Sequence, residues 1–161
     1  MADNKKKLKI LAAGDFHADT SVAEKLAEQA EKENVDLVLL NGDLVEEEKV
    51  EGIIGPFLKK KKRVFFVHGN HESLATANFL ADFYGITHLH GYGIKYGHVG
   101  IFGCGGANIG LDQLSEDEIS TVELMLKEET SKIMIAPDKV IEKPLVMLKK
   151  LLKLLRLRCI Y

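Results

Sequence analysis

The sequence predicts an α/β protein organised around a parallel sheet, and three observations support this fold class. Short apolar stretches recur early in the chain and have the length expected of buried parallel strands. Segments with helical periodicity separate them, as in repeated β-α units. A polar run containing glycine follows each stretch, as expected where a strand ends at a turn. The three stretches are Leu8–Ala13, Leu37–Leu40 and Val64–Val67.

Size and composition indicate a single globular domain covering residues 1–161. Hydrophobic residues make up 46% of the chain and charged residues 29%, which is an ordinary balance for a globular protein. The net charge of −2 gives no general reason to expect nucleic acid or a membrane as partner. We expect no transmembrane segment, a cytoplasmic location, and two reduced thiols at Cys104 and Cys159.

Two helices are predicted between the three strands. Ser21–Glu24 has the pattern of a capping box, and an apolar stripe follows it to a helix end near Asn34. A second helix is predicted over Glu46–Leu58. The five basic residues Lys59–Arg63 are interpreted as a solvated turn, with attraction of an anionic substrate as the lesser alternative. The stripe consists of Val22, Leu26 and Ala30, with Ala23 and Ala27 beside them.

A third helix and several short strands are predicted next. The helix covers Ser73–Tyr84, and Gly85 suits a left-handed C-terminal cap. The strands that follow predict a change from alternating units to a meander, with a hairpin at Gly97-His98. They cover Ile86–Leu89, Gly93–Tyr96 and Val99–Gly103, and a later strand covers Lys132–Ile135.

The C-terminal part differs in composition. Ser115–Glu118 is a second capping box that predicts a helix. Residues 132–161 form an atypical basic tail, in which leucines between Leu145 and Leu155 recur at helical spacing among lysines and arginines. We interpret this stripe as a helix packing on the sheet, with membrane-surface binding or contact with a partner helix as alternatives.

Metal-binding side chains follow the three strands. In open α/β sheets, the ligand site lies beyond the carboxyl ends of the strands, so these side chains should meet at one edge. Carboxylate, imidazole and amide groups together suit Mn, Fe or Zn better than Ca. Each residue alone could be a helix cap or a surface group, but together they predict a metal site. The candidates are Asp15, His17, Asp43, Asn70 and His71.

These runs resemble the motifs of the calcineurin-like metallophosphoesterases over residues 8–105. The family pattern Asp-x-His, Gly-Asp and Gly-Asn-His-Asp/Glu stands here as Asp15-Phe16-His17, Gly42-Asp43 and Gly69–Glu72. The resemblance implies a sandwich of β-sheets flanked by helices. The family's later His and Gly-His-x-His blocks are absent, since no histidine follows His98, so the fold is expected to be incomplete at the C-terminus.

The resemblance also implies a role for each candidate. Asp15 and His17 would hold a first divalent ion, Asn70 a second, and Asp43 would bridge the two. His71 would be a catalytic residue that binds no metal and stabilises the transition state or protonates the departing oxygen. Glu72 would orient His71 or a metal-bound group.

The resulting function hypothesis is a metal-dependent phosphoesterase acting on phosphomonoesters or phosphodiesters, with activity reduced by the missing ligands. One or two ions per chain are expected, with Mn favoured over Fe, Zn or Ni. The alternative is a catalytically degenerate relative that acts as a binding module. Nuclease action lacks support, because no basic groove with interleaved aromatic residues is evident. A homo-oligomer is a further possibility, since the Leu145–Leu155 stripe offers a contact.

Four histidines remain outside this assignment, and one of them, His98, is interpreted as a solvated residue in a tight turn. His88 and His90 stand two apart in a predicted strand and should project to one face. That spacing suits metal ligands, but we interpret both as structural or surface residues. His68 is left out of the predicted site because the matching position varies in the family.

Overall fold

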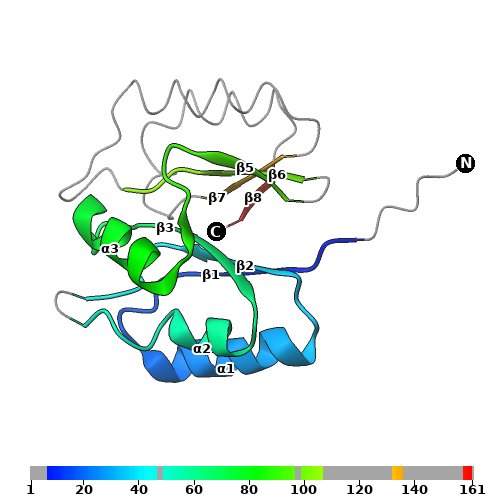
Figure 1. Cartoon of the computed structure of the whole chain (residues 1–161), viewed down its shortest axis with the longest axis horizontal. Helices are drawn as coiled ribbons and strands as arrows, with labels where there is room; N and C mark the ends of the chain where they lie inside the picture. Colours follow the sequence, from blue (N-terminus) through cyan, green and yellow to red (C-terminus); the bar gives the residue numbers. More distant parts are fainter. Residues whose placement is uncertain (1–6, 47–48, 97–98, 107–131, 136–157, 161) are drawn as a thin grey trace, which may run out of the picture.

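The computed structural model describes residues 7–46, 49–96, 99–106, 132–135 and 158–160, and shows two β-sheets packed face to face with helices outside the first (Figure 1). The predicted α/β class and the sandwich of sheets with flanking helices are confirmed. The predicted helices after Ser115 and over Leu145–Leu155, and the hairpin turn at Gly97-His98, lie outside the described residues.

The first sheet is parallel, with its strands in chain order. Its register pairs Ala13 with Leu40 and Asn41 with Val67, so three strands end side by side. The runs that carry the candidate ligands leave from these carboxyl ends, as the sequence predicts. The strands are β1 (Ile10–Ala13), β2 (Leu37–Asn41), β3 (Arg63–Val67) and β4 (Thr87–His88).

The second sheet is mixed, and the predicted meander is wrong. β4 stays in the first sheet, parallel to β3, because the helix before it returns the chain to the same edge. Strands β5 and β6 are antiparallel, whereas β6, β7 and β8 run parallel to one another. The strands are β5 (Gly93–Tyr96), β6 (Val99–Gly103), β7 (Lys132–Ile135) and β8 (Arg158–Ile160).

Helix α1 (Thr20–Lys32) is capped differently from the prediction. The Asp19 carboxylate accepts hydrogen bonds from the amides of Ser21 and Val22, so Asp19 is the N-cap and Ser21 lies inside the first turn. The buried face consists of Ala23, Ala27 and Ala30, whereas Val22 is exposed. These small side chains allow the helix to lie close to the sheet.

The other two helices show one error and one agreement. Helix α2 (Gly55–Lys59) is a single short turn, so the predicted helix over Glu46–Leu58 is wrong. Gly52 has a positive φ of 85°, which interrupts a helix, and Pro56 suits only a first turn. Helix α3 (Leu74–Tyr84) begins after Ser73, which is its N-cap, and ends at Gly85, which is a left-handed C-cap as predicted.

Alternation along the strands produces two hydrophobic layers. Val38, Leu40 and Phe66 face the helices, while Leu37, Leu39 and Val67 face the second sheet. Sheet one is therefore buried on both faces, which explains its continuous apolar strands. A sheet held in this way positions the loops at its carboxyl edge.

The basic run before β3 is used in packing rather than at the candidate site. Lys60 pairs with Glu31 at 2.6 Å, and Lys62 donates to the Val35 carbonyl at 3.1 Å. Arg63 lies over the Tyr96 ring, 5.4 Å from its centroid. Because this run leads into β3, it lies at the amino edge of the sheet, opposite the loops that carry the candidate ligands. Among the described residues, no helix has the length and apolarity needed to cross a membrane.

Candidate metal centre

The loops after β1 and β2 bring three of the predicted ligands together. Asp15, His17 and Asp43 each offer a ligand atom, and these atoms all lie within 4.8 Å of one another. Asp15 and His17 are exposed and Asp43 is buried, so the group lies at the surface with one carboxylate anchored inside. The loops after β1 and β2 thus bring these three side chains together, and their role as metal ligands stays a prediction.

The backbone at this site is held in an unfavourable conformation. Asp15, His17 and Asp43 have φ values of 60°, 45° and 49°, in the left-handed region that non-glycine residues seldom occupy. The two loops support each other, because the Asp15 amide donates to the Gly42 carbonyl and the His17 amide to the Asp43 carbonyl, each at 3.0 Å. Strain of this kind persists only where its surroundings impose it, and it clusters at functional sites.

Asp43 also connects the second loop to the third. Its Oδ1 accepts hydrogen bonds from the amides of Asn70 at 2.9 Å and His71 at 3.2 Å. A Cβ added at Gly69 would lie 2.0 Å from that oxygen, so only glycine permits this approach. The third predicted run is thus docked on Asp43 through its backbone.

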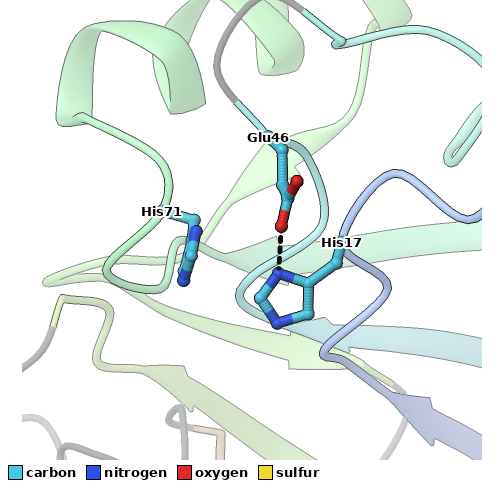
Figure 2. A group of neighbouring side chains, drawn as sticks. All are labelled: His17, Glu46 and His71. Atoms are coloured by element: carbon cyan, nitrogen blue, oxygen red, sulfur yellow. Dashed lines mark hydrogen bonds and ion pairs between the residues drawn. The ribbon is translucent and has the colours of Figure 1, made fainter.

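His17 lies between two carboxylates. Its Nδ1 is 2.8 Å from Oε1 of Glu46 (Figure 2), and its Nε2 is 3.1 Å from Oδ1 of Asp15. Partial burial lowers the pKa of His17, but the hydrogen bond to Glu46 and the charge of Asp15 outweigh this effect, so the pKa is raised above its ordinary value. The ring is therefore oriented from both sides.

His71 and Glu46 form a second group with His17. The His71 ring is exposed and meets the His17 ring edge-on, with centroids 4.6 Å apart. His17, Glu46 and His71 also have ligand atoms within 4.8 Å of one another (Figure 2). Glu46 is absent from the predicted site because the sequence analysis assigned it to a helix over Glu46–Leu58, which the described residues of the structure do not form. An acid three residues after Asp43, in the same loop, is the signal that was available.

Glu72 anchors the loops that carry the candidate ligands. Its buried carboxylate accepts the amides of Asp43 at 3.1 Å, Val45 at 2.9 Å and Gly69 at 2.7 Å, together with that of Leu44. Burial raises the pKa of Glu72 and the Asp43 charge raises it further, although the amide bonds oppose this shift. Glu72 thus holds the second and third loops in register.

Glu72→Gln should lower the free energy of unfolding by about 2–6 kcal/mol. Each Glu72 oxygen accepts two amides, whereas the glutamine NH₂ group would face two donors and leave them unpaired, at roughly 1–3 kcal/mol each. Urea denaturation measures the change. Glu24→Gln on the exposed face of α1 is the matched control and should stay within about 0.5 kcal/mol of wild type. Equal effects of the two substitutions would contradict the anchoring role.

The donors at this edge fit a divalent ion. Two carboxylates and an imidazole converge within 4.8 Å, a mixed oxygen and nitrogen set that suits Mn, Fe or Zn. At the end of β2, the buried Oδ1 of Asn41 has no hydrogen-bond partner among the described residues. A Cβ added at Gly14 would lie 3.1 Å from this oxygen, which places it beside the residue before Asp15. This edge of the sheet therefore contains a buried oxygen acceptor that no described residue satisfies.

Comparison with known sequences identifies a family and related proteins. A family model for calcineurin-like phosphoesterases matches residues 8–140. Two proteins from two strains of Helicobacter pylori, both named uncharacterized metallophosphoesterase, are each 37% identical over 75 residues. The match covers 42% of this chain and 20% of each relative, so the chain spans about one fifth of their length.

A solved structure shares the fold. The crystal structure of TT1561 of Thermus thermophilus superposes with a TM-score of 0.62 at 16% identity. The match covers 80% of this chain and 67% of that one. At this identity the likeness concerns the fold alone.

Proposed function

Because this chain belongs to the calcineurin-like phosphoesterase family, we propose that it is a metal-dependent phosphoesterase that hydrolyses phosphomonoesters or phosphodiesters. The observation that carries the proposal is the convergence of Asp15, His17 and Asp43 at the carboxyl edge of the first sheet. When bound there, a divalent ion supplies Lewis-acid stabilisation of the phosphoryl oxygens and a nucleophile at neutral pH.

Asp15, His17 and Asp43 would hold one ion firmly, with Mn²⁺ favoured over Fe, Zn or Ni. With Nδ1 directed at Glu46, His17 has its Nε2 on the side of Asp15, where an ion would bind. A carboxylate on the other ring nitrogen fixes the tautomer and orientation of a ligating histidine. Asp43, together with Asn70, would serve a second ion more weakly, since two protein donors are fewer than a stable site normally has.

His71 would be the catalytic residue that holds no metal. Its exposed imidazole lies beside His17, with the Glu46 carboxylate within reach of both rings. From this position it could donate a proton to a departing oxygen or a hydrogen bond to a phosphoryl oxygen. Hydrogen bonds to Asp43 and Glu72 fix the backbone of the loop that carries His71, so the position of its ring is restricted.

Hydrolysis of an aryl phosphate and a bis-aryl phosphate tests this function. Protein stripped of metal should be inactive and should regain activity on addition of Mn²⁺. An equal, low rate with Mn²⁺ and with chelator would favour the catalytically degenerate alternative, a binding module. Metal-stimulated cleavage of the diester alone would narrow the proposal to a phosphodiesterase.

A further inference from the structure

Three histidines outside the proposed centre pack together where β3, β4 and the end of β6 meet. The centroids of the His68 and His88 rings are 5.0 Å apart, those of His68 and His90 are 4.8 Å apart, and those of His88 and His90 are 5.9 Å apart. His68 is buried, with 1% of its surface exposed, and the other two are half-buried. Three imidazoles in mutual contact form an unusual structural cluster, because a protonated ring would be repelled by its neighbours.

A chain of hydrogen bonds runs through this cluster from the helix layer. His88 Nδ1 is 3.4 Å from the Oδ1 of Asn78 on α3, and His88 Nε2 is 2.9 Å from Nδ1 of His68. If His88 donates its Nδ1–H to the Asn78 oxygen, its Nε2 accepts a hydrogen bond from His68. Burial, followed by the charges of His68 and His90, lowers the pKa of His88 to about 3, so the ring stays neutral and can keep this bond.

His88 is itself held in place by β4. Its ring stacks on Phe66, with centroids 4.9 Å apart, and the strand register pairs the same two residues. On the other side of the cluster, His90 Nδ1 accepts the Gly105 amide at 3.0 Å. The cluster thus has a rigid frame against which the buried His68 ring is fixed.

His68 connects this frame to the proposed centre, because it directly precedes Gly69. Its carbonyl accepts the Gly106 amide at 2.9 Å, and its ring leaves no room for a Cβ at Gly105, which would lie 2.5 Å from Nδ1. The next residues carry the Asn70 and His71 amides that bind Asp43. A change in the His68 ring would therefore be transmitted to the backbone that docks on Asp43.

We propose that His88 is a positioning residue for the proposed metal centre, acting through its hydrogen bond to His68 on the loop that carries Asn70 and His71. This inference rests on the proposed function, because it takes that loop to be part of a metal-binding catalytic site. Groups that orient metal ligands from outside typically change metal affinity or activity by about 10–100-fold when removed.

Two substitutions separate the hydrogen bond from the packing. His88→Phe keeps an aromatic ring that can stack on Phe66 but cannot bond to His68. His88→Gln loses the ring but retains an amide oxygen that can accept from His68 Nδ1. We expect His88→Phe to weaken Mn²⁺ binding by about tenfold or more and His88→Gln to restore most of it. Thr87→Ala, an exposed change in the same strand, is the matched control and should bind as wild type.

The readouts are calorimetric titration with Mn²⁺, the visible absorption of the Co²⁺-loaded protein, and the melting temperature of the metal-free protein. Weaker binding and an altered Co²⁺ spectrum in His88→Phe, with rescue by His88→Gln, would support the proposal. Unchanged Mn²⁺ binding in a folded His88→Phe variant would overturn it. An equal loss of Mn²⁺ affinity in both variants, in proportion to the fall in their melting temperatures, would also overturn it. Loss of a whole equivalent of Co²⁺ would also overturn it, because the histidines would then bind the ion themselves.

A fallback variant and the wild-type titration separate failure of this proposal from failure of the proposed function. If His88→Phe does not fold, Asn78→Ala removes the outer hydrogen bond from an exposed position on α3. It should weaken Mn²⁺ binding measurably, and wild-type binding would overturn the proposal. If the wild-type protein binds no metal, the proposed function fails, which is a different outcome from wild-type binding that His88→Phe leaves unchanged.

Discussion

Asp43→Asn should abolish metal binding at both positions of the proposed centre. Asp43 provides the buried carboxylate next to Asp15 and His17, and the substitution removes its charge while keeping its size and an oxygen for the Asn70 and His71 amides. The fold should therefore survive while the attraction for two cations is lost. Elemental analysis after loading with Mn²⁺ and gel filtration measures the effect.

Asp82→Asn, an exposed change on α3, is the matched control and should retain wild-type metal content. Retention of a full equivalent of Mn²⁺ by Asp43→Asn would place the ion elsewhere. The group of His17, Glu46 and His71 would then be the first alternative, since it also has ligand atoms within 4.8 Å of one another.

His71→Ala should lower turnover by roughly 10²–10⁴-fold, the range for loss of a general acid or base, while leaving metal content nearly intact. The exposed His71 ring lies against His17, but His71 is not one of the residues expected to hold the first ion. Steady-state hydrolysis of an aryl phosphate, with metal content measured on the same sample, separates the two effects. Loss of the metal in His71→Ala would show that His71 is a ligand.

The strand framework and the edge that carries the site could be predicted from the sequence. Apolar stretches bounded by polar runs marked β2 and β3 almost to the residue, because a parallel sheet buried on both faces requires continuous apolar strands. The carboxyl ends of parallel strands lie together, so Asp15 and Asp43 had to be close. Such inferences depend on chain direction and strand order alone.

Features that depend on loop conformation or on contacts between distant residues could not be predicted. Glu46 contacts His17 because residues 43–46 are not helical, and helical propensity does not predict this conformation. The contact between His68 and His88 depends on the register that pairs Phe66 with His88 across two strands. Period-two spacing could only place His88 and His90 on one face.

Glu72 shows a similar limit. Its motif position implied that it orients His71 or a metal-bound group, but its burial and its bonds to amides of two loops depend on how these loops close over it. A buried carboxylate surrounded by backbone donors is recognised only when the donors are in place, because each comes from a residue without a distinctive side chain.

Calorimetric titration of the monomeric, metal-free protein with Mn²⁺ tests the central claim most directly. We predict one tight equivalent per chain, held by Asp15, His17 and Asp43, because the described residues bring these three donors within 4.8 Å. A second ion should bind weakly, since Asp43 and Asn70 alone would serve it. Absence of tight binding would contradict the proposed centre, and two tight equivalents would show that further ligands complete it.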